Sequence, residues 1–117
     1  MPIVRVYGVP ESTKKKHLAE LVGAIQDQIA EVKKLEVYRD QVSVFFPRDL
    51  FQAGLGEEIC VFIAIYGKPE RTDEILYQMA DRVQRKINKD FFPSSLVEVI
   101  PQVVNSEHCS SSEGITS

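Results

Sequence analysis

The sequence predicts the same order of strands and helices twice, and this repetition limits the possible folds more than any other feature. Strands are expected at 2–7, 41–46, 59–66 and 96–100. A helix follows the first strand near Ser12, and another follows the third strand near Thr72, about sixty residues later. A right-handed crossover places each helix on one face of its strand pair. We therefore expect an α+β fold made of duplicated β-α-β units, with a four-stranded mixed sheet and two helices on one face.

Two strands have patterns that indicate which of their faces are buried. In the first strand, Ile3, Arg5 and Tyr7 should point to the face opposite Val4 and Val6. The third strand is a nearly unbroken apolar run, which is typical of a central strand buried on both faces. With both helices on one side of the sheet, the other face stays uncovered. The pattern therefore favours oligomerisation through that face.

Both helices have a start signal and a single apolar stripe. A side-chain oxygen of Ser12 or Thr13 is expected to cap the first helix, which should run to about Lys34. Thr72 should cap the second helix. Apolar residues recur at steps of three and four along each helix: Leu18, Leu21, Val22, Ile25, Ile29 and Val32 in the first, and Ile75, Leu76, Met79, Val83 and Ile87 in the second.

Composition changes mark the remaining segments. Residues 48–58 contain Gly54 and Gly56 and are predicted to form a turn-rich connection. From 105 onward the chain is rich in serine and other small polar residues, which bury too little apolar surface to order themselves. We expect one domain over 1–104 and a mobile polar C-terminal tail over 105–117.

Charge and cysteine content exclude several classes of protein. Lys and Arg number 14 against 17 Asp and Glu, a formal net charge of −3, so nucleic-acid binding by a cationic surface is not expected. No apolar run approaches the ~20 residues of a membrane span, and the N-terminus lacks the pattern of a secretory signal. Cys60 and Cys109 are too few for a disulfide framework, which favours a reduced, cytoplasmic compartment.

The residue that most strongly suggests chemistry is Pro2. Removal of Met1, which is expected before a small residue, leaves a free secondary amine at the start of a strand. Such an amine is a useful base if burial or nearby cations lower its pKa toward neutrality. The alternative is that this is an ordinary Met-Pro start with no catalytic role.

Pro2–Tyr7, the helix after it, the strand ending in Val42–Pro47 and the duplicated unit together resemble the tautomerase superfamily. The resemblance covers about residues 2–102 and is closest to the fused, two-unit members, such as the migration inhibitory factors, malonate semialdehyde decarboxylases and cis-chloroacrylate dehalogenases. It implies that Pro2 is the catalytic base or acid and that the protein assembles as a homotrimer.

The resemblance also implies substrate-binding residues. Dehalogenase- and decarboxylase-like members hold two cations at the turn into the second helix, where this chain has Lys68 and Arg71. Those cations would grip a substrate carboxylate and favour the neutral prolyl amine. Phe51 resembles the aromatic wall beside the proline. The alternatives are that Lys68 and Arg71 are solvated loop residues and that Phe51 packs on a neighbouring subunit.

Some family positions differ in this chain. Where oxalocrotonate tautomerase has two arginines, this sequence has Ser12 and Ser43, so a dicarboxylate is not expected to bind in that way. Val97 and Val99 replace a tyrosine and an asparagine of migration inhibitory factor. These differences are compatible with an uncharacterised branch.

The sequence therefore supports two hypotheses. In the first, the protein is an isomerase of the tautomerase type, or a hydratase or lyase, that acts on a small unsaturated or 2-keto carboxylic acid. No cofactor is expected, because no phosphate-binding loop is present and His108 with Cys109 are too few ligands for zinc. In the second, it is a non-catalytic trimeric or ferredoxin-like module that binds a small molecule.

Overall fold

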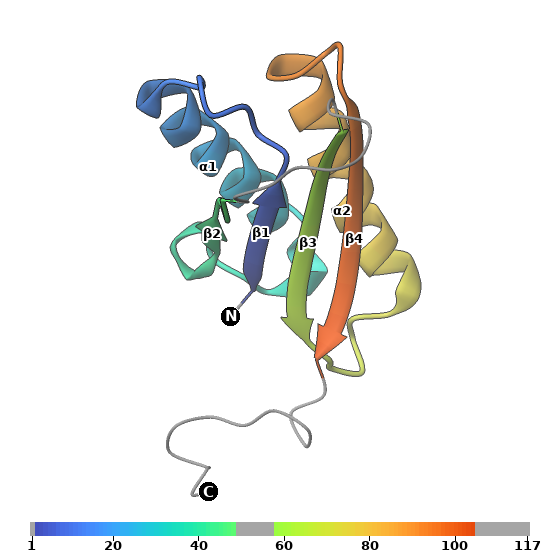
Figure 1. Ribbon diagram of the computed structural model, residues 1–117. Coiled ribbons are helices and arrows are strands. Elements are labelled where there is room, and N and C mark those ends of the chain that lie inside the picture. Colours follow the sequence, from blue (N-terminus) through green and yellow to red (C-terminus); the bar gives the residue numbers. More distant parts are fainter. Residues whose placement is uncertain (1, 49–57, 105–117) are drawn as a thin grey trace, which may run out of the picture.

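The computed structural model describes residues 2–48 and 58–104. Its strands and helices confirm the predicted α+β architecture (Figure 1). In chain order they are β1 (Ile3–Tyr7), α1 (Lys15–Ala30), the 3₁₀ turns η1 (Lys33–Leu35) and η2 (Arg39–Gln41), β2 (Ser43–Phe45), β3 (Glu58–Tyr66), α2 (Asp73–Asp90) and β4 (Leu96–Val104).

The four strands form one mixed sheet in the order β2-β1-β3-β4. β1 and β2 are parallel, β3 and β4 are parallel, and β1 is antiparallel to β3. Each parallel pair is connected through a helix, and both helices lie on the same face of the sheet (Figure 1). The duplicated β-α-β arrangement is therefore confirmed, with the two units joined by the antiparallel β1–β3 pairing.

The core lies between the sheet and the helices. Val4 and Val6 of β1 are fully buried there, whereas Arg5 on the opposite face is exposed, as the alternation predicts. Most of the other core residues are also branched aliphatic, and the stiff Val and Ile side chains of the strands suit a pleated surface. Further buried members are Leu21, Ile25, Ile29, Ile59, Val61, Ile63, Ile65, Met79, Val83 and Ile87.

The prediction that the third strand is covered on both faces is wrong for the protomer. Along β3, alternate residues from Ile59 to Ile65 are buried, and the residues between them, such as Phe62, are only half-buried. Helices cover one face only, and within residues 2–48 and 58–104 no helix or strand packs against the apolar residues of the other face. We call that second face, which carries Arg5, Tyr7, Phe45, Phe62 and Ile100, the open sheet face.

Both predicted ends of the first helix need correction. Lys14 is the N-cap residue and no side chain caps α1; Thr13 instead donates its backbone N–H to the Pro10 carbonyl at 3.0 Å. α1 stops at Ala30 rather than near Lys34. Val32 takes an extended conformation and is buried, as is Leu35 in the following 3₁₀ turn.

The second helix starts as predicted. The Thr72 side-chain oxygen accepts a hydrogen bond from the Ile75 N–H at 3.3 Å. Asp73 and Glu74 lie in the first turn, where their charge favours the positive end of the helix dipole. Leu76, Met79, Val83 and Ile87 of the predicted stripe are buried against the sheet, and Ile75 is partly buried.

Strand lengths differ from the predicted ones at the two sheet edges. β2 is shorter than expected, at Ser43–Phe45. β4 does not stop at Ile100 but continues through Pro101 to Val104. Pro101 is tolerated because β4 is an edge strand, where a missing N–H can face away from the ladder.

Gly8 allows the chain to leave β1. Its φ is +89°, and a Cβ at this position would lie 2.2 Å from the carbonyl oxygen of Glu58. Only glycine avoids both the steric strain of that φ and the collision. The β1–α1 connection therefore passes close against the start of β3.

Candidate functional site

Pro2 lies at the end of the sheet where β1 begins. It is buried, and its carbonyl accepts a hydrogen bond from the Ser43 N–H at 3.1 Å. On the other side of β1, Ile3 pairs with Ala64, so the antiparallel register places Pro2 level with Ile65. Pro2 is thus held between β2 and the last residues of β3.

The connection from β3 to α2 lies at this same end of the sheet (Figure 1). The Gly67 N–H donates to the Val104 carbonyl at 3.0 Å, which fixes the connection to the end of β4. The Arg71 N–H donates to the Lys68 carbonyl at 2.9 Å and closes a turn. The structure therefore brings the loop that carries Lys68 and Arg71 to the sheet end that carries Pro2.

Arg71 is bound by backbone carbonyls. Its Nη1 donates to the Tyr66 carbonyl at 2.7 Å, and its Nη2 donates to the Leu35 carbonyl at 2.9 Å. Nε is buried without a hydrogen-bond partner among the described residues. The guanidinium thus ties the start of α2 to the end of β3 and to the turn after α1.

Lys68 has a different environment. Its side chain is exposed and makes no hydrogen bond or ion pair with the described part of the chain. An ammonium group on a flexible stem can reach a charged group that approaches this sheet end from solvent. Phe51, the third predicted substrate-binding residue, lies outside the described residues.

The open sheet face carries the free thiol of Cys60. Burial raises the pKa of this thiol, and the carboxylates of Glu98 and Glu58 raise it further. A thiol in such an acidic and partly buried place is a poor nucleophile at neutral pH. Cys60 is therefore not a catalytic candidate.

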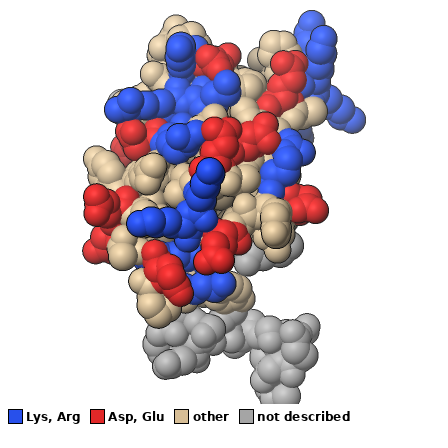
Figure 2. Space-filling view, turned by 180° about the vertical axis from the view of Figure 1, so that it is seen from behind, with Lys and Arg blue, Asp and Glu red and all other residues tan. Residues whose placement is uncertain are grey.

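The face that carries the helices has no patch of one charge. Figure 2 shows basic and acidic side chains interspersed over it, in keeping with the ion pairs Arg39–Asp27, Arg82–Glu31, Arg85–Asp81 and Lys86–Asp90. Over residues 2–48 and 58–104, no group of three or more His, Cys, Asp or Glu side chains could hold a metal ion. No described helix has the length and apolar character needed to cross a membrane.

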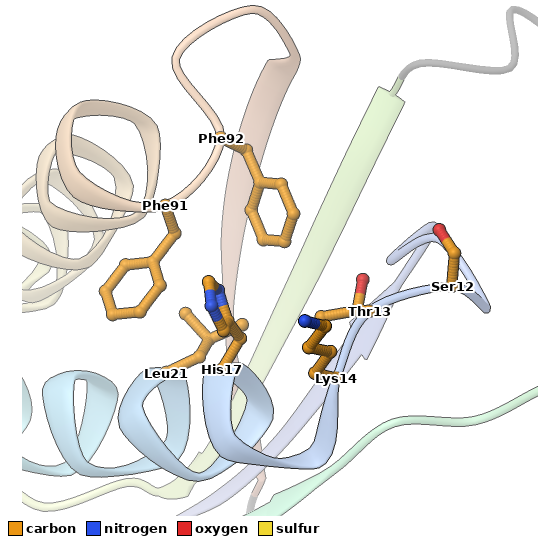
Figure 3. A pocket seen from close by; sticks show the side chains of 7 residues that line it. All are labelled: Ser12, Thr13, Lys14, His17, Leu21, Phe91 and Phe92. Atoms are coloured by element: carbon orange, nitrogen blue, oxygen red, sulfur yellow. The ribbon is translucent and has the colours of Figure 1, made fainter.

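A pocket of about 330 Å³ lies at the other end of the sheet from Pro2. It is formed where the start of α1 meets the end of α2 (Figure 3). Its lining residues are Ser12, Thr13, Lys14, His17, Leu21, Phe91 and Phe92.

This pocket is not predicted from the sequence. Phe91 and Phe92 follow the last helical residue of α2, and the basic run begins at Lys14. The one sequence signal for it is the pair of adjacent phenylalanines at the end of α2, which indicates an apolar surface there. Nothing local to either segment shows that the two are adjacent.

Comparison with known proteins shows similarity in structure but not in sequence. No family model matches the chain, and no curated protein matches it. A solved structure of a member of the cis-3-chloroacrylic acid dehalogenase family superposes with a TM-score of 0.72 at 14% identity, over 98% of this chain and 83% of that one.

Two further solved structures have similar values. A wild-type fused 4-OT protein, solved as an asymmetric trimer, has a TM-score of 0.72 at 12% identity, covering 94% of this chain and 92% of that one. A domain of unknown function from Sebaldella termitidis has a TM-score of 0.69 at 13% identity, covering 96% of both chains. At such identities the likeness shows the fold.

Proposed function

We propose that this chain, which has the fold of the tautomerase superfamily, is an enzyme that uses the amine of Pro2 as a general base or acid. Its substrate would be a small unsaturated or 2-keto carboxylic acid. The observation that carries the proposal is the position of Pro2, buried at a sheet end beside a loop with two cationic side chains. Removal of Met1 is required, because an amide nitrogen is not a base.

The proposed proton transfer follows from this position. Burial disfavours the charged ammonium form and so leaves a lone pair on the Pro2 nitrogen. That nitrogen takes a proton from C3, the carbon next to the 2-keto group, or from the enol oxygen, and returns it to a different atom of the same substrate. Keto-enol tautomerisation is the simplest reaction of this kind. With Pro2 protonated, the same site would favour hydration or decarboxylation.

The two cations have separate tasks in this proposal. Lys68, being exposed and free of described partners, would meet the substrate carboxylate. Arg71 would add positive charge while it holds the loop in place through the Tyr66 and Leu35 carbonyls. Positive charge fixed before the reaction stabilises the negative charge that develops on the conjugated oxygen.

A homotrimer is also part of the proposal. The open sheet face exposes large apolar side chains, among them Phe45 at 53% and Ile100 at 37%. Contiguous exposed apolar surface marks interaction sites. A structurally similar fused 4-OT protein is trimeric. A cytoplasmic location stays a prediction from the cysteine content alone.

The proposal is tested by the state of the N-terminus and by the Pro2→Ala variant. Mass spectrometry should show that Met1 is absent from the purified protein. Ketonisation of phenylpyruvate should then be slower in Pro2→Ala by about a hundredfold or more, the usual size of a general-base contribution. Pro10→Ala, which changes an exposed proline in the β1–α1 connection, is the matched control. Equal rates for wild type and Pro2→Ala would exclude Pro2 from the reaction.

Retained Met1 would favour the second function, a non-catalytic module that binds small molecules. The observation that supports it is the pocket at the opposite end of the sheet, which contains neither Pro2 nor Lys68. A protein of this kind would bind its ligand equally well with and without Pro2.

A further inference from the structure

We propose that the pocket between α1 and α2 binds a small organic anion with a flat apolar body, that is, an aromatic carboxylate. This site is separate from the proposed prolyl site and does not depend on it. Its volume of about 330 Å³ is at the lower end of the range for small-molecule sites, which is roughly 300–1,000 Å³.

One side of the pocket is apolar. Leu21 is buried and closes its inner side, and Phe91 and Phe92 are half-buried. Figure 3 shows the two phenylalanine side chains extending from the end of α2 toward the start of α1, with His17 and Lys14 facing them. Aromatic walls of this kind suit a flat ring, because offset and edge-to-face contacts add to the hydrophobic gain.

The aromatic wall is held in place before any ligand binds. The Asn88 side-chain amide donates to the Phe92 carbonyl at 3.1 Å and to the Ser95 carbonyl at 3.0 Å. The Phe92 N–H also donates to the Ile87 carbonyl at 2.9 Å. Preorganisation of this kind reduces the entropy cost of binding.

The other side of the pocket is polar and has unused hydrogen-bonding capacity. The side chains of Ser12, Thr13, Lys14 and His17 make no hydrogen bond or ion pair with the described residues. These groups supply two hydroxyls, an ammonium and an imidazole on the side opposite the phenylalanines. A ligand with a ring at one end and a hydrogen-bond acceptor at the other matches both sides.

The positive charge at the pocket favours a ligand whose hydrogen-bond acceptor is an anionic group. Lys14 lines the pocket and Lys15 and Lys16 follow it, with no acidic residue in the first turn of α1. Two of the acids next to lining residues have basic partners: Glu11 pairs with Arg48, and Asp90 pairs with Lys86. A carboxylate is therefore the complementary group.

The test is a titration of the ¹⁵N-labelled full chain with benzoate, followed by NMR. Benzoate should shift the amide signals of residues 13–17 and 91–92 and saturate with a Kd on the order of 1 mM. Benzamide, which lacks the charge, and acetate, which lacks the ring, should each bind at least about fivefold more weakly. Absence of saturable shifts at these amides would overturn the proposal.

Two lysine variants distinguish a direct contact between Lys14 and benzoate from a general effect of the positive charge of this segment. Lys14→Ala should weaken benzoate binding by about fivefold or more, whereas Lys15→Ala, which removes the same charge from a residue outside the lining, should change it by less than about twofold. Equal effects of the two variants would contradict a specific contact. Both lysines are exposed, so neither variant is expected to affect folding.

Two further variants complete the test. Phe92→Ala should weaken benzoate more than acetate, because it removes part of the ring's contact surface. Pro2→Ala should leave benzoate binding at this pocket unchanged, whether or not it abolishes catalysis. Shifts confined to Ile3, Ile65 and Lys68 would place benzoate at the prolyl end instead and would refute this pocket.

Discussion

At the residue scale, the two cations of the β3–α2 connection differ in environment although they are three positions apart. Lys68 is exposed, whereas Arg71 donates to two carbonyls and has a buried Nε. The planar guanidinium of arginine presents several donors in fixed directions and can bridge two segments, whereas the ammonium group of lysine is a single point charge. Arg71 thus has a structural task in addition to the proposed electrostatic one.

Arg71→Ala should lower the free energy of unfolding by about 1–3 kcal/mol, because the Leu35 and Tyr66 carbonyls lose charged donors. Urea unfolding measures this loss. Lys68→Ala is the control and should change stability by less than about 0.5 kcal/mol. A higher KM in Arg71→Ala with unchanged stability would show instead that Arg71 acts only on the substrate.

The Cys60 thiol gives a prediction about its reactivity and pH. Negative charge on Glu98 raises the thiol's pKa, so removing that charge lowers the pKa and increases the thiolate fraction at any pH below it. In a Cys109→Ser background, Glu98→Gln should react with a disulfide reagent at pH 8 roughly two to five times faster. Glu20→Gln, an exposed acid on α1, serves as control and should leave the rate unchanged.

At the element scale, the two helices begin in different ways. Thr72 satisfies an N–H at the start of α2, whereas no side chain does so at the start of α1. Ser12 and Thr13, the expected caps, instead line the pocket. Similar Ser and Thr residues before the two helices therefore have different roles: Thr72 caps α2, whereas Ser12 and Thr13 line the pocket.

Thr72→Ala should reduce the free energy of unfolding by about 1 kcal/mol, the usual cost of losing an N-cap side chain. Thermal and urea unfolding of the purified variant would show the change. Thr72→Ser keeps the oxygen and should restore most of the stability. Thr13→Ala should have little effect on stability, and an effect as large as that of Thr72→Ala would mean that Thr13 caps α1 in solution.

At the scale of the whole molecule, no described helix or strand covers the open sheet face. The register places Phe45, Arg5, Phe62 and Ile100 in one row across all four strands. Tyr7 packs edge-on against Phe62, with ring centroids 5.8 Å apart. Such a row would be buried in the proposed trimer.

Introducing a charge into this row should break the assembly. Wild type should have a mass of about three times 13.2 kDa, and Phe45→Glu and Ile100→Glu should shift it to a monomer, as measured by size exclusion with light scattering. Tyr77→Glu, at a residue of α2 that is 75% exposed, should remain trimeric. A monomeric wild type, or dissociation of Tyr77→Glu to the same extent, would contradict this role for the open sheet face.

The sequence by itself determined the order of the elements, the inward face of β1 and α2, and the cap of α2. Each of these depends on neighbours within a few residues: the alternation of Val4 and Val6, the stripe from Leu76 to Ile87, and the Thr72 oxygen beside Ile75. Such short-range patterns can be interpreted from the sequence alone, because a helix or strand positions its own side chains. The proposal for Pro2 likewise began from its position in the chain, and its catalytic role stays a prediction.

Only the tertiary structure decided which distant segments meet. β4 continues through Pro101 because it lies at a sheet edge, and α1 ends at Ala30, after which an extended Val32 and a 3₁₀ turn bury Val32 and Leu35. Arg71 is anchored by Leu35, and Phe91 and Phe92 reach the start of α1. These contacts join segments separated by tens of residues, so they depend on how the two β-α-β units pack together, which no local pattern specifies.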